Sequence, residues 1–216
     1  MRRESSTVVA LVGEVTGDLL AGLGRTPNVA VARPPASAAS EPAADAARQP
    51  GWEAGAQGMR DAARLRSTYV IVPADPLAEV AASWQQMWDP AAGSPGAAGF
   101  ESSAADALAA WQQKRFELPD YYLVIAPPQG SAAGPDLYLG PLRAVRPRRV
   151  AVGGLADGGL ADRLALSSSV LDALRSLEHG PWWPPLDELL AAARGFYAGG
   201  LAETQQLARL PAWPGR

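Results

Sequence analysis

Three short segments of this chain carry apolar side chains at consecutive positions, and this feature constrains the fold most. They cover residues 7–12, 67–72 and 121–126, and are rich in Val, Ile and Tyr. Strands that are covered on both faces show continuous apolar runs, whereas strands with one face in water alternate. Segments with helical spacing separate these runs. The alternation predicts an open, mainly parallel sheet with helices on both faces, a Rossmann-like three-layer α/β fold.

The chain is long enough for one α/β domain, which we expect to span residues 1–216. Its 216 residues are 48% hydrophobic and 19% charged, which is typical of globular proteins. Residues 33–58 are mostly Pro, Ala, Ser and Gly, and such a segment buries too little apolar area to offset its ordering entropy. We expect a mobile loop there, and a helical C-terminal segment from residue 160.

Turn and cap residues indicate the remaining elements. Thr16 is a suitable N-cap for a helix over residues 17–23, and Asp75 with Pro76 begins another. Ser103 is placed to cap a helix that follows a loop at 90–99. Further strands are predicted at 28–32, 136–139 and 149–152. Two C-terminal helices, 160–177 and 186–208, form a helical pair on either side of a break at 179–185.

The segment Leu11–Leu20, "LVGEVTGDLL", places two glycines where a strand turns into a helix. Backbone N–H groups in such a loop can bind a phosphate. A P-loop also needs Gly-Lys-Ser/Thr, whereas this loop has no lysine and carries two carboxylates. We favour a tight turn and keep ligand binding as the alternative, with these candidate residues: Gly13, Glu14, Gly17, Asp18 and Asp75.

The residues "GEVTGDLLAGL" from Gly13 are similar to the opening loop of lipid-A-disaccharide synthases, which reads Gly-Glu-x-Ser-Gly-Asp. Trp111–Arg115 echoes a second segment of that family. The resemblance implies a sugar-nucleotide glycosyltransferase fold, with Gly13, Glu14, Gly17 and Asp18 in the loop. It covers about a dozen residues. The chain is too short for that two-domain enzyme and has no counterpart of its nucleotide-binding half.

Reactive side chains are scarce. The chain has no cysteine and a single histidine, His179, which rules out thiolate catalysis and Cys-ligated metal. His179 suits a helix C-terminus better than a catalytic site. A carboxylate Mg²⁺ site would draw on Asp75, Asp120 and Asp136, but no spacing singles them out. We expect neither a metal nor a cofactor, and leave open whether the protein is an enzyme.

Two clusters suggest an interaction surface. Trp182 and Trp183 lie between prolines that stiffen the backbone, and a rigid exposed tryptophan can anchor an interface. The alternative is that both rings fill the gap between the last two helices. Four arginines fall within seven positions of one another, as a candidate interface or as a solvated turn between two strands: Arg143, Arg146, Arg148 and Arg149.

The charge balance narrows the class of partner. The net charge is −3, and 18 of the 19 basic residues are arginine, a bias typical of the coding sequences of high-GC bacteria. A mildly acidic chain without a basic stripe is unsuited to nucleic acid, and no apolar run is long enough for a membrane span or signal peptide. We expect a cytoplasmic, non-catalytic protein that binds another protein or itself. The alternative is a nucleotide- or sugar-nucleotide-binding protein or transferase.

Overall fold

The computed structural model describes residues 6–32, 51–87, 96–125, 137–153 and 160–207. Five parallel strands form one open sheet in the order β2-β3-β1-β4-β5. Val9 of the central strand lies opposite Ile71 on one side and Tyr121 on the other. The predicted three-layer α/β fold is therefore confirmed, with these strands: β1 (Thr7–Gly13), β2 (Val29–Val31), β3 (Tyr69–Val72), β4 (Tyr121–Ile125) and β5 (Val150–Gly153).

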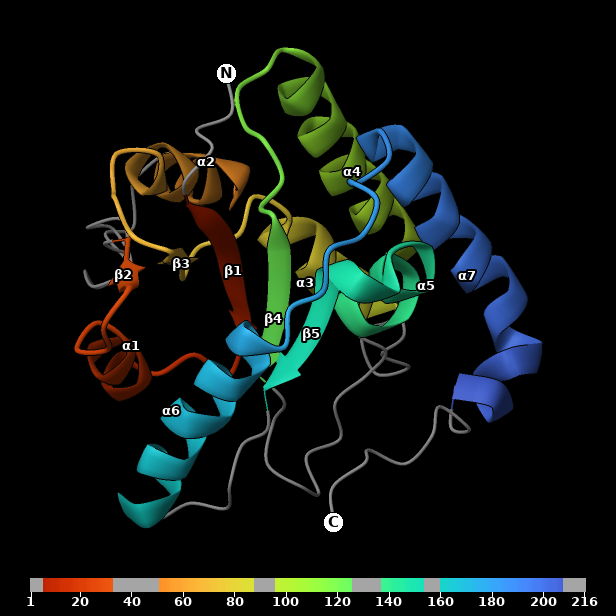
Figure 1. Ribbon diagram of the computed structural model, residues 1–216. Helices are drawn as coiled ribbons and strands as arrows, with labels where there is room; N and C mark the ends of the chain where they lie inside the picture. Colours follow the sequence, from red (N-terminus) through yellow and green to blue (C-terminus); the bar gives the residue numbers. More distant parts are fainter. Residues whose placement is uncertain (1–5, 33–50, 88–95, 126–136, 154–159, 208–216) are drawn as a thin grey trace, which may run out of the picture.

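Helices cover both faces of the sheet (Figure 1). The connection from β1 to β2 runs towards one edge, and the later connections run towards the other. Because crossovers are right-handed, this reversal puts α1 on the face opposite to α2, α3 and α4. The helical elements are α1 (Gly17–Leu23), α2 (Gly51–Ala62), α3 (Ala78–Met87), α4 (Gly96–Gln112), the π-helix η3 (Tyr138–Leu142), α5 (Arg143–Val145), the 3₁₀ turn η4 (Pro147–Arg149), α6 (Leu160–Arg175) and α7 (Leu186–Leu207).

Alternate residues of the central strands pack into different layers. Val9 and Leu11 of β1 lie in the cluster that includes α1 and α6. Ala10 and Val12 lie in the larger cluster formed with α2, α3, α4, η3 and α7. Every residue of β4 is buried. Burial on both faces explains why these strands are continuously apolar.

The helix α2 corrects the loop prediction for residues 33–58. Residues 51–58 form most of α2, while residues 33–50 lie outside the described part of the chain. Glycine lowers helix propensity, so the composition favoured a loop. Tertiary packing prevails instead, because Trp52 and Ala56 are buried one helical turn apart in the core.

Two further sequence predictions differ from the structure. The strand predicted at 136–139 is not formed where the structure describes it, because residues 138 and 139 begin the π-helix η3 and residue 136 lies outside the described residues. Ser103 is a buried residue within α4, which already begins at Gly96, so it is not a cap. The two predicted C-terminal helices are present as α6 and α7; α6 packs with α1, and α7 packs with η3 and α4 on the opposite face.

In the described residues, no helix is sufficiently long and apolar to cross a bilayer.

Candidate functional site

A pocket opens at the carboxyl edge of the sheet, beside the end of β1. The neighbouring strands β1 and β3 leave the sheet towards opposite faces, to α1 and to α3 respectively. In open α/β sheets, this divergence of adjacent connections creates the crevice in which ligands bind. The pocket has a volume of about 430 Å³, within the range of small-molecule sites. We call it the carboxyl-edge pocket.

One wall of the carboxyl-edge pocket is a stripe of short side chains on α3. Ala78, Ala81 and Ala82 follow one another at helical spacing, and Gln85 continues the same face. The end of β1 and the start of η3 also contribute to the lining. The remaining lining residues are Leu11, Val12, Gly13, Val15, Pro73, Asp75, Leu137 and Tyr138.

The loop after β1 forms a tight turn against β4. Gly13 has a φ of +93°, and a Cβ there would lie 2.2 Å from the carbonyl oxygen of Ile125. The Glu14 N–H donates to that same carbonyl at 3.3 Å, and the Val15 N–H donates to the Gly13 carbonyl at 2.8 Å. Only glycine combines this φ with such a close approach. Two N–H groups that a phosphate cradle would use are thus bonded within the protein.

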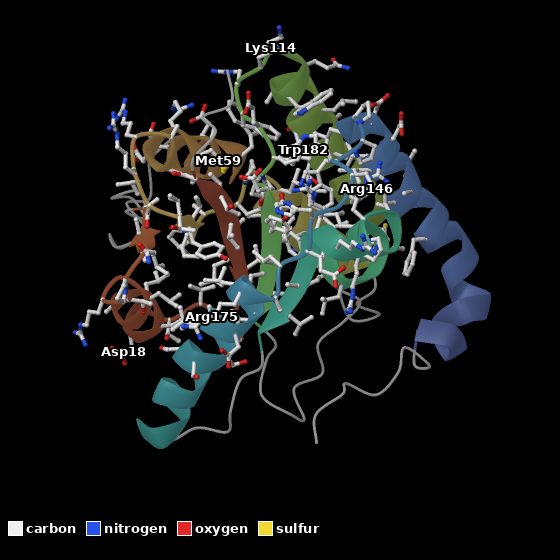
Figure 2. All side chains as sticks on the ribbon, viewed as in Figure 1. Asp18, Met59, Lys114, Arg146, Arg175 and Trp182 are labelled. Carbon is white, nitrogen blue, oxygen red and sulfur yellow. The ribbon has the colours of Figure 1, made fainter. Side chains whose placement is uncertain are left out.

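The structure separates the sequence-predicted ligand residues into two groups. Gly13 and Asp75 line the carboxyl-edge pocket. Glu14, Gly17 and Asp18 are exposed and are not among its lining residues. Thr16 caps α1 as expected, since its hydroxyl accepts from the Leu19 N–H at 3.3 Å. Figure 2 labels Asp18 at the outer side of the molecule, on α1.

Asp75 is the buried polar centre of the pocket. Its carboxylate accepts hydrogen bonds from the hydroxyl of Tyr122 at 2.9 Å and from that of Tyr138 at 2.5 Å. The backbone N–H of Leu77 is a third donor. Asp75 therefore ties the end of β3 to β4 and η3. The sequence gives no sign of this network, because Tyr122 lies inside a strand and Tyr138 in a segment predicted to be one.

Burial controls the ionisation of this network. Desolvation raises the pKa of Asp75 to about 6, against the opposing effect of its three hydrogen bonds. Burial and the neighbouring Asp75 charge also raise the pKa of Tyr122 well above its ordinary value. A carboxylate with a perturbed pKa in a crevice is typical of a functional site, although structural networks also produce such shifts.

Two glycines of α2 fix the position of Asp75. A Cβ on Gly55 would lie 2.1 Å from the backbone nitrogen of Pro76 and 2.3 Å from the carbonyl carbon of Asp75. A Cβ on Gly58 would lie 2.7 Å from a Val72 methyl group. The backbone of α2 therefore rests directly on the segment that follows β3. The glycines that suggested a loop in the sequence support the floor of the site.

A second candidate surface lies around Trp182 near the amino edge of the sheet. Trp183 is buried and donates its indole N–H to the Pro119 carbonyl at 2.8 Å, whereas Trp182 is 37% exposed. One ring is thus a core residue and the other faces solvent, so they do not both fill an interhelical gap. Figure 2 shows Trp182 and Arg146 near each other, far from Asp18 on α1.

Arginines hold the α6–α7 connection against the sheet. The Arg149 guanidinium donates to the carbonyls of Asp120, Gly180 and Pro181 at 2.7–3.1 Å, and it lies between the rings of Tyr121 and Trp182. Arg146 donates to the Trp182 carbonyl at 2.7 Å.

Arg148 forms an exposed ion pair with Glu178 at 3.1 Å, and Arg143 is exposed on α5. We call the surface formed by Trp182, Arg143, Arg146, Arg148 and Glu178 the tryptophan surface.

The remaining candidate residues, His179 and the aspartates considered for a metal site, do not lie together in the described part of the chain. His179 lies beyond the end of α6, exposed in the connection to α7, rather than in the last turn of the helix. Asp75 is at the carboxyl edge, whereas Asp120 precedes β4 at the amino edge and accepts from the Val8 N–H. Asp136 lies outside the described residues. In the part of the chain that the structure describes, no group of three or more potential ligands is placed to hold a metal ion.

Comparison with known proteins gives no match: no protein-family model fits the chain, and no curated protein or solved structure is significantly similar to it.

Proposed function

We propose that this protein binds a small organic molecule in the carboxyl-edge pocket. The observation that carries the proposal is the position of a perturbed, buried carboxylate in a crevice between diverging connections of a parallel sheet. The apolar side chains of the lining would contact the body of the ligand, and the polar end formed by Asp75 and Tyr138 would orient it. This develops the ligand-binding alternative of the sequence analysis and moves its centre from the Gly13 loop to Asp75.

Substitution at the rim of the pocket tests this proposal without disturbing the core. Ala82 is exposed on α3 and lines the pocket, so Ala82→Trp should fill the entrance while α3 stays folded. Ala105 is exposed on α4 and is not among the lining residues. Ala105→Trp is therefore a matched control for the added ring.

A fragment screen followed by two-dimensional ¹H–¹⁵N NMR provides the measurement. Binding fragments should shift the amide signals of Gly13, Ala78 and Gln85 in the wild type and in Ala105→Trp, but not in Ala82→Trp. Nucleotides and sugar nucleotides belong in the same screen. The absence of any fragment that shifts these amides, or shifts that persist in Ala82→Trp, would rule out the pocket as the binding site.

A second candidate function is self-association through the tryptophan surface. The specific observation is that Trp182 is exposed and yet held in place, with Arg149 against its ring and Arg146 on its carbonyl. Rigid Trp and Arg side chains are frequent anchors of interfaces. The surface also carries the exposed Arg148–Glu178 ion pair, and a two-fold interface would bring this same patch of two copies together.

Light scattering coupled to size-exclusion chromatography tests this second candidate. A dimer of the wild type that dissociates on Trp182→Ala supports it. Trp111→Ala is a control for the loss of an indole ring elsewhere, because Trp111 belongs to α4 and is only partly exposed. This variant should leave the dimer intact. A wild-type monomer at every concentration would contradict self-association.

A further inference from the structure

The hydrogen-bond directions at the polar end of the carboxyl-edge pocket restrict the ligand that it can take. Tyr122 and Tyr138 both donate their hydroxyl hydrogens to Asp75. A phenol has a single hydrogen to donate, so towards any further partner each phenol oxygen acts only as an acceptor. The Asp75 carboxylate is also an acceptor. The polar end therefore offers acceptors, and a complementary ligand must bring the donor.

The charge of the lining residues also favours a ligand that brings a hydrogen-bond donor and carries no negative charge. Among the residues that the structure describes, the lining set includes the Asp75 carboxylate and no lysine, arginine or histidine. Glu14 continues the chain directly after Gly13 and adds a second carboxylate near this edge. Since an anionic ligand would meet a carboxylate with no compensating cation in the lining, a phosphate group is disfavoured here.

The capacity of the Asp75 carboxylate leaves room for a further donor. Its two oxygens provide about four lone-pair sites, and the described residues place three donors there, from Tyr122, Tyr138 and the Leu77 backbone. Within that part of the chain these donors are neutral and none is a cation, and burial of a charge without a counter-charge is costly. An ammonium group at the pocket would supply both the missing donor and the missing charge.

We propose that the carboxyl-edge pocket binds a small organic cation, namely a primary amine on a short apolar or aromatic body, with its ammonium group donating to Asp75. This inference rests on the proposed ligand-binding function and specifies its chemical class. The alanine stripe of α3 and the end of β1 contact the apolar body. The pocket volume of about 430 Å³ admits an arylalkylamine.

Three probes with similar bodies and different head groups test this class. Phenethylamine carries a cation, 2-phenylethanol a neutral donor and acceptor, and 3-phenylpropionate an anion. Titration calorimetry of the full chain at pH 7.5 should give the tightest binding for the amine, weaker binding for the alcohol, and a Kd for the carboxylate at least about tenfold above that of the amine.

Two substitutions test whether the preference for the amine probe depends on Asp75 and on the carboxyl-edge pocket. Asp75→Asn should weaken amine binding at least about tenfold and change alcohol binding less than about threefold. Ala82→Trp should abolish binding of all three probes, and Ala105→Trp should leave it intact. The comparison of the three probes on the wild type does not depend on whether Asp75→Asn folds.

The two proposals fail in different ways. Equal or tighter binding of 3-phenylpropionate, or amine binding that is unchanged in a folded Asp75→Asn variant, overturns the cation class and leaves the pocket as a binding site. Failure of the amine to bind the wild type, while other fragments shift the pocket amides, also overturns the class alone. If no fragment shifts those amides, the proposed function itself fails.

Discussion

The hydroxyl of Tyr138 donates a 2.5 Å hydrogen bond to the carboxylate of Asp75, which lies 63 residues earlier in the chain. This contact joins the segment after β3 to η3, and both of its residues line the carboxyl-edge pocket. It also connects the stability of the fold to the ionisation of its candidate site, since the same carboxylate serves both.

The first prediction concerns the pH dependence of stability. The pKa of Asp75 is raised from 3.8 to about 6 in the folded state, so between about pH 4 and pH 6 the folded state binds more protons than the unfolded state. The free energy of unfolding must then fall as the pH rises through this window, and the contribution of a protonated Asp75 is lost above it.

The substitution Asp75→Asn should remove this dependence because the amide does not titrate. The difference in unfolding free energy between wild type and variant should change by about 2 kcal/mol between pH 4 and pH 7, with the wild type relatively more stable at pH 4. Urea unfolding at several pH values measures it. A difference that is independent of pH would show that Asp75 is not desolvated as described.

A second prediction concerns the helix that supports Asp75. Gly55→Ala places a Cβ within 2.3 Å of backbone atoms of the 75–76 segment, and backbone cannot move aside as a flexible side chain can. We expect a loss of at least about 3 kcal/mol of unfolding free energy, together with altered amide signals around Asp75.

Gly99→Ala is the matched control for that substitution. Gly99 is also in a helix, α4, but a Cβ there would meet no atom within 4 Å. Because alanine is the better helix former, the control should gain about 0.5–1 kcal/mol. A Gly55→Ala variant that is as stable as Gly99→Ala would contradict the direct contact between α2 and the 75–76 segment.

The third prediction concerns the buried guanidinium of Arg149. Arg149→Met keeps most of the apolar stem but leaves the carbonyls of Asp120, Gly180 and Pro181 without their donor. We expect a loss of about 2–4 kcal/mol in chemical unfolding, with increased proteolysis between α6 and α7. Arg175→Met is the control, since that side chain is 72% exposed and pairs with Asp172 in the adjacent helical turn; it should cost less than about 0.5 kcal/mol. Equal losses for the two variants would refute the role of Arg149.

A fourth prediction concerns the bidentate ion pair between α4 and α7. The Arg194 guanidinium donates to both carboxylate oxygens of Glu101 at 2.7–3.1 Å, and these hydrogen bonds lower the pKa of Glu101. The stabilisation is therefore present at neutral pH and is lost as the pH falls through the lowered pKa of Glu101.

Both side chains are about half exposed, so a double-mutant cycle should give a coupling of about 0.5 kcal/mol that weakens with salt. A coupling that is unchanged in high salt would contradict an ion pair.

The sequence predicts the layers of this fold well, and it predicts the candidate site only in part. The strands β1, β3 and β4 are identifiable because burial on both faces makes them continuously apolar. Asp75 is identifiable because it follows a strand and precedes a proline, although α3 begins only at Ala78 rather than at Pro76 as predicted. Its partners are not, since the pairing of Asp75 with Tyr122 and Tyr138 depends on how strands β3 and β4 and the π-helix η3 come together.

Two features escape sequence reasoning for the same physical reason. Gly55 and Gly58 make residues 51–58 resemble a loop, yet they are required where α2 lies against the end of β3. Similarly, the arginines before β5 suggest a solvated turn, yet Arg149 is buried among carbonyls about 30 residues away. In both cases the residue type is explained by a contact with a segment that is distant in the sequence, and a local pattern does not reveal such a contact.

The most direct test of this account is a crystal structure of the protein soaked with phenethylamine. The account predicts the amine in the carboxyl-edge pocket, with its nitrogen about 2.7–3.2 Å from an Asp75 carboxylate oxygen and its ring against the alanines of α3. A pocket that stays empty at saturating amine, or an amine bound only at the tryptophan surface, would contradict it.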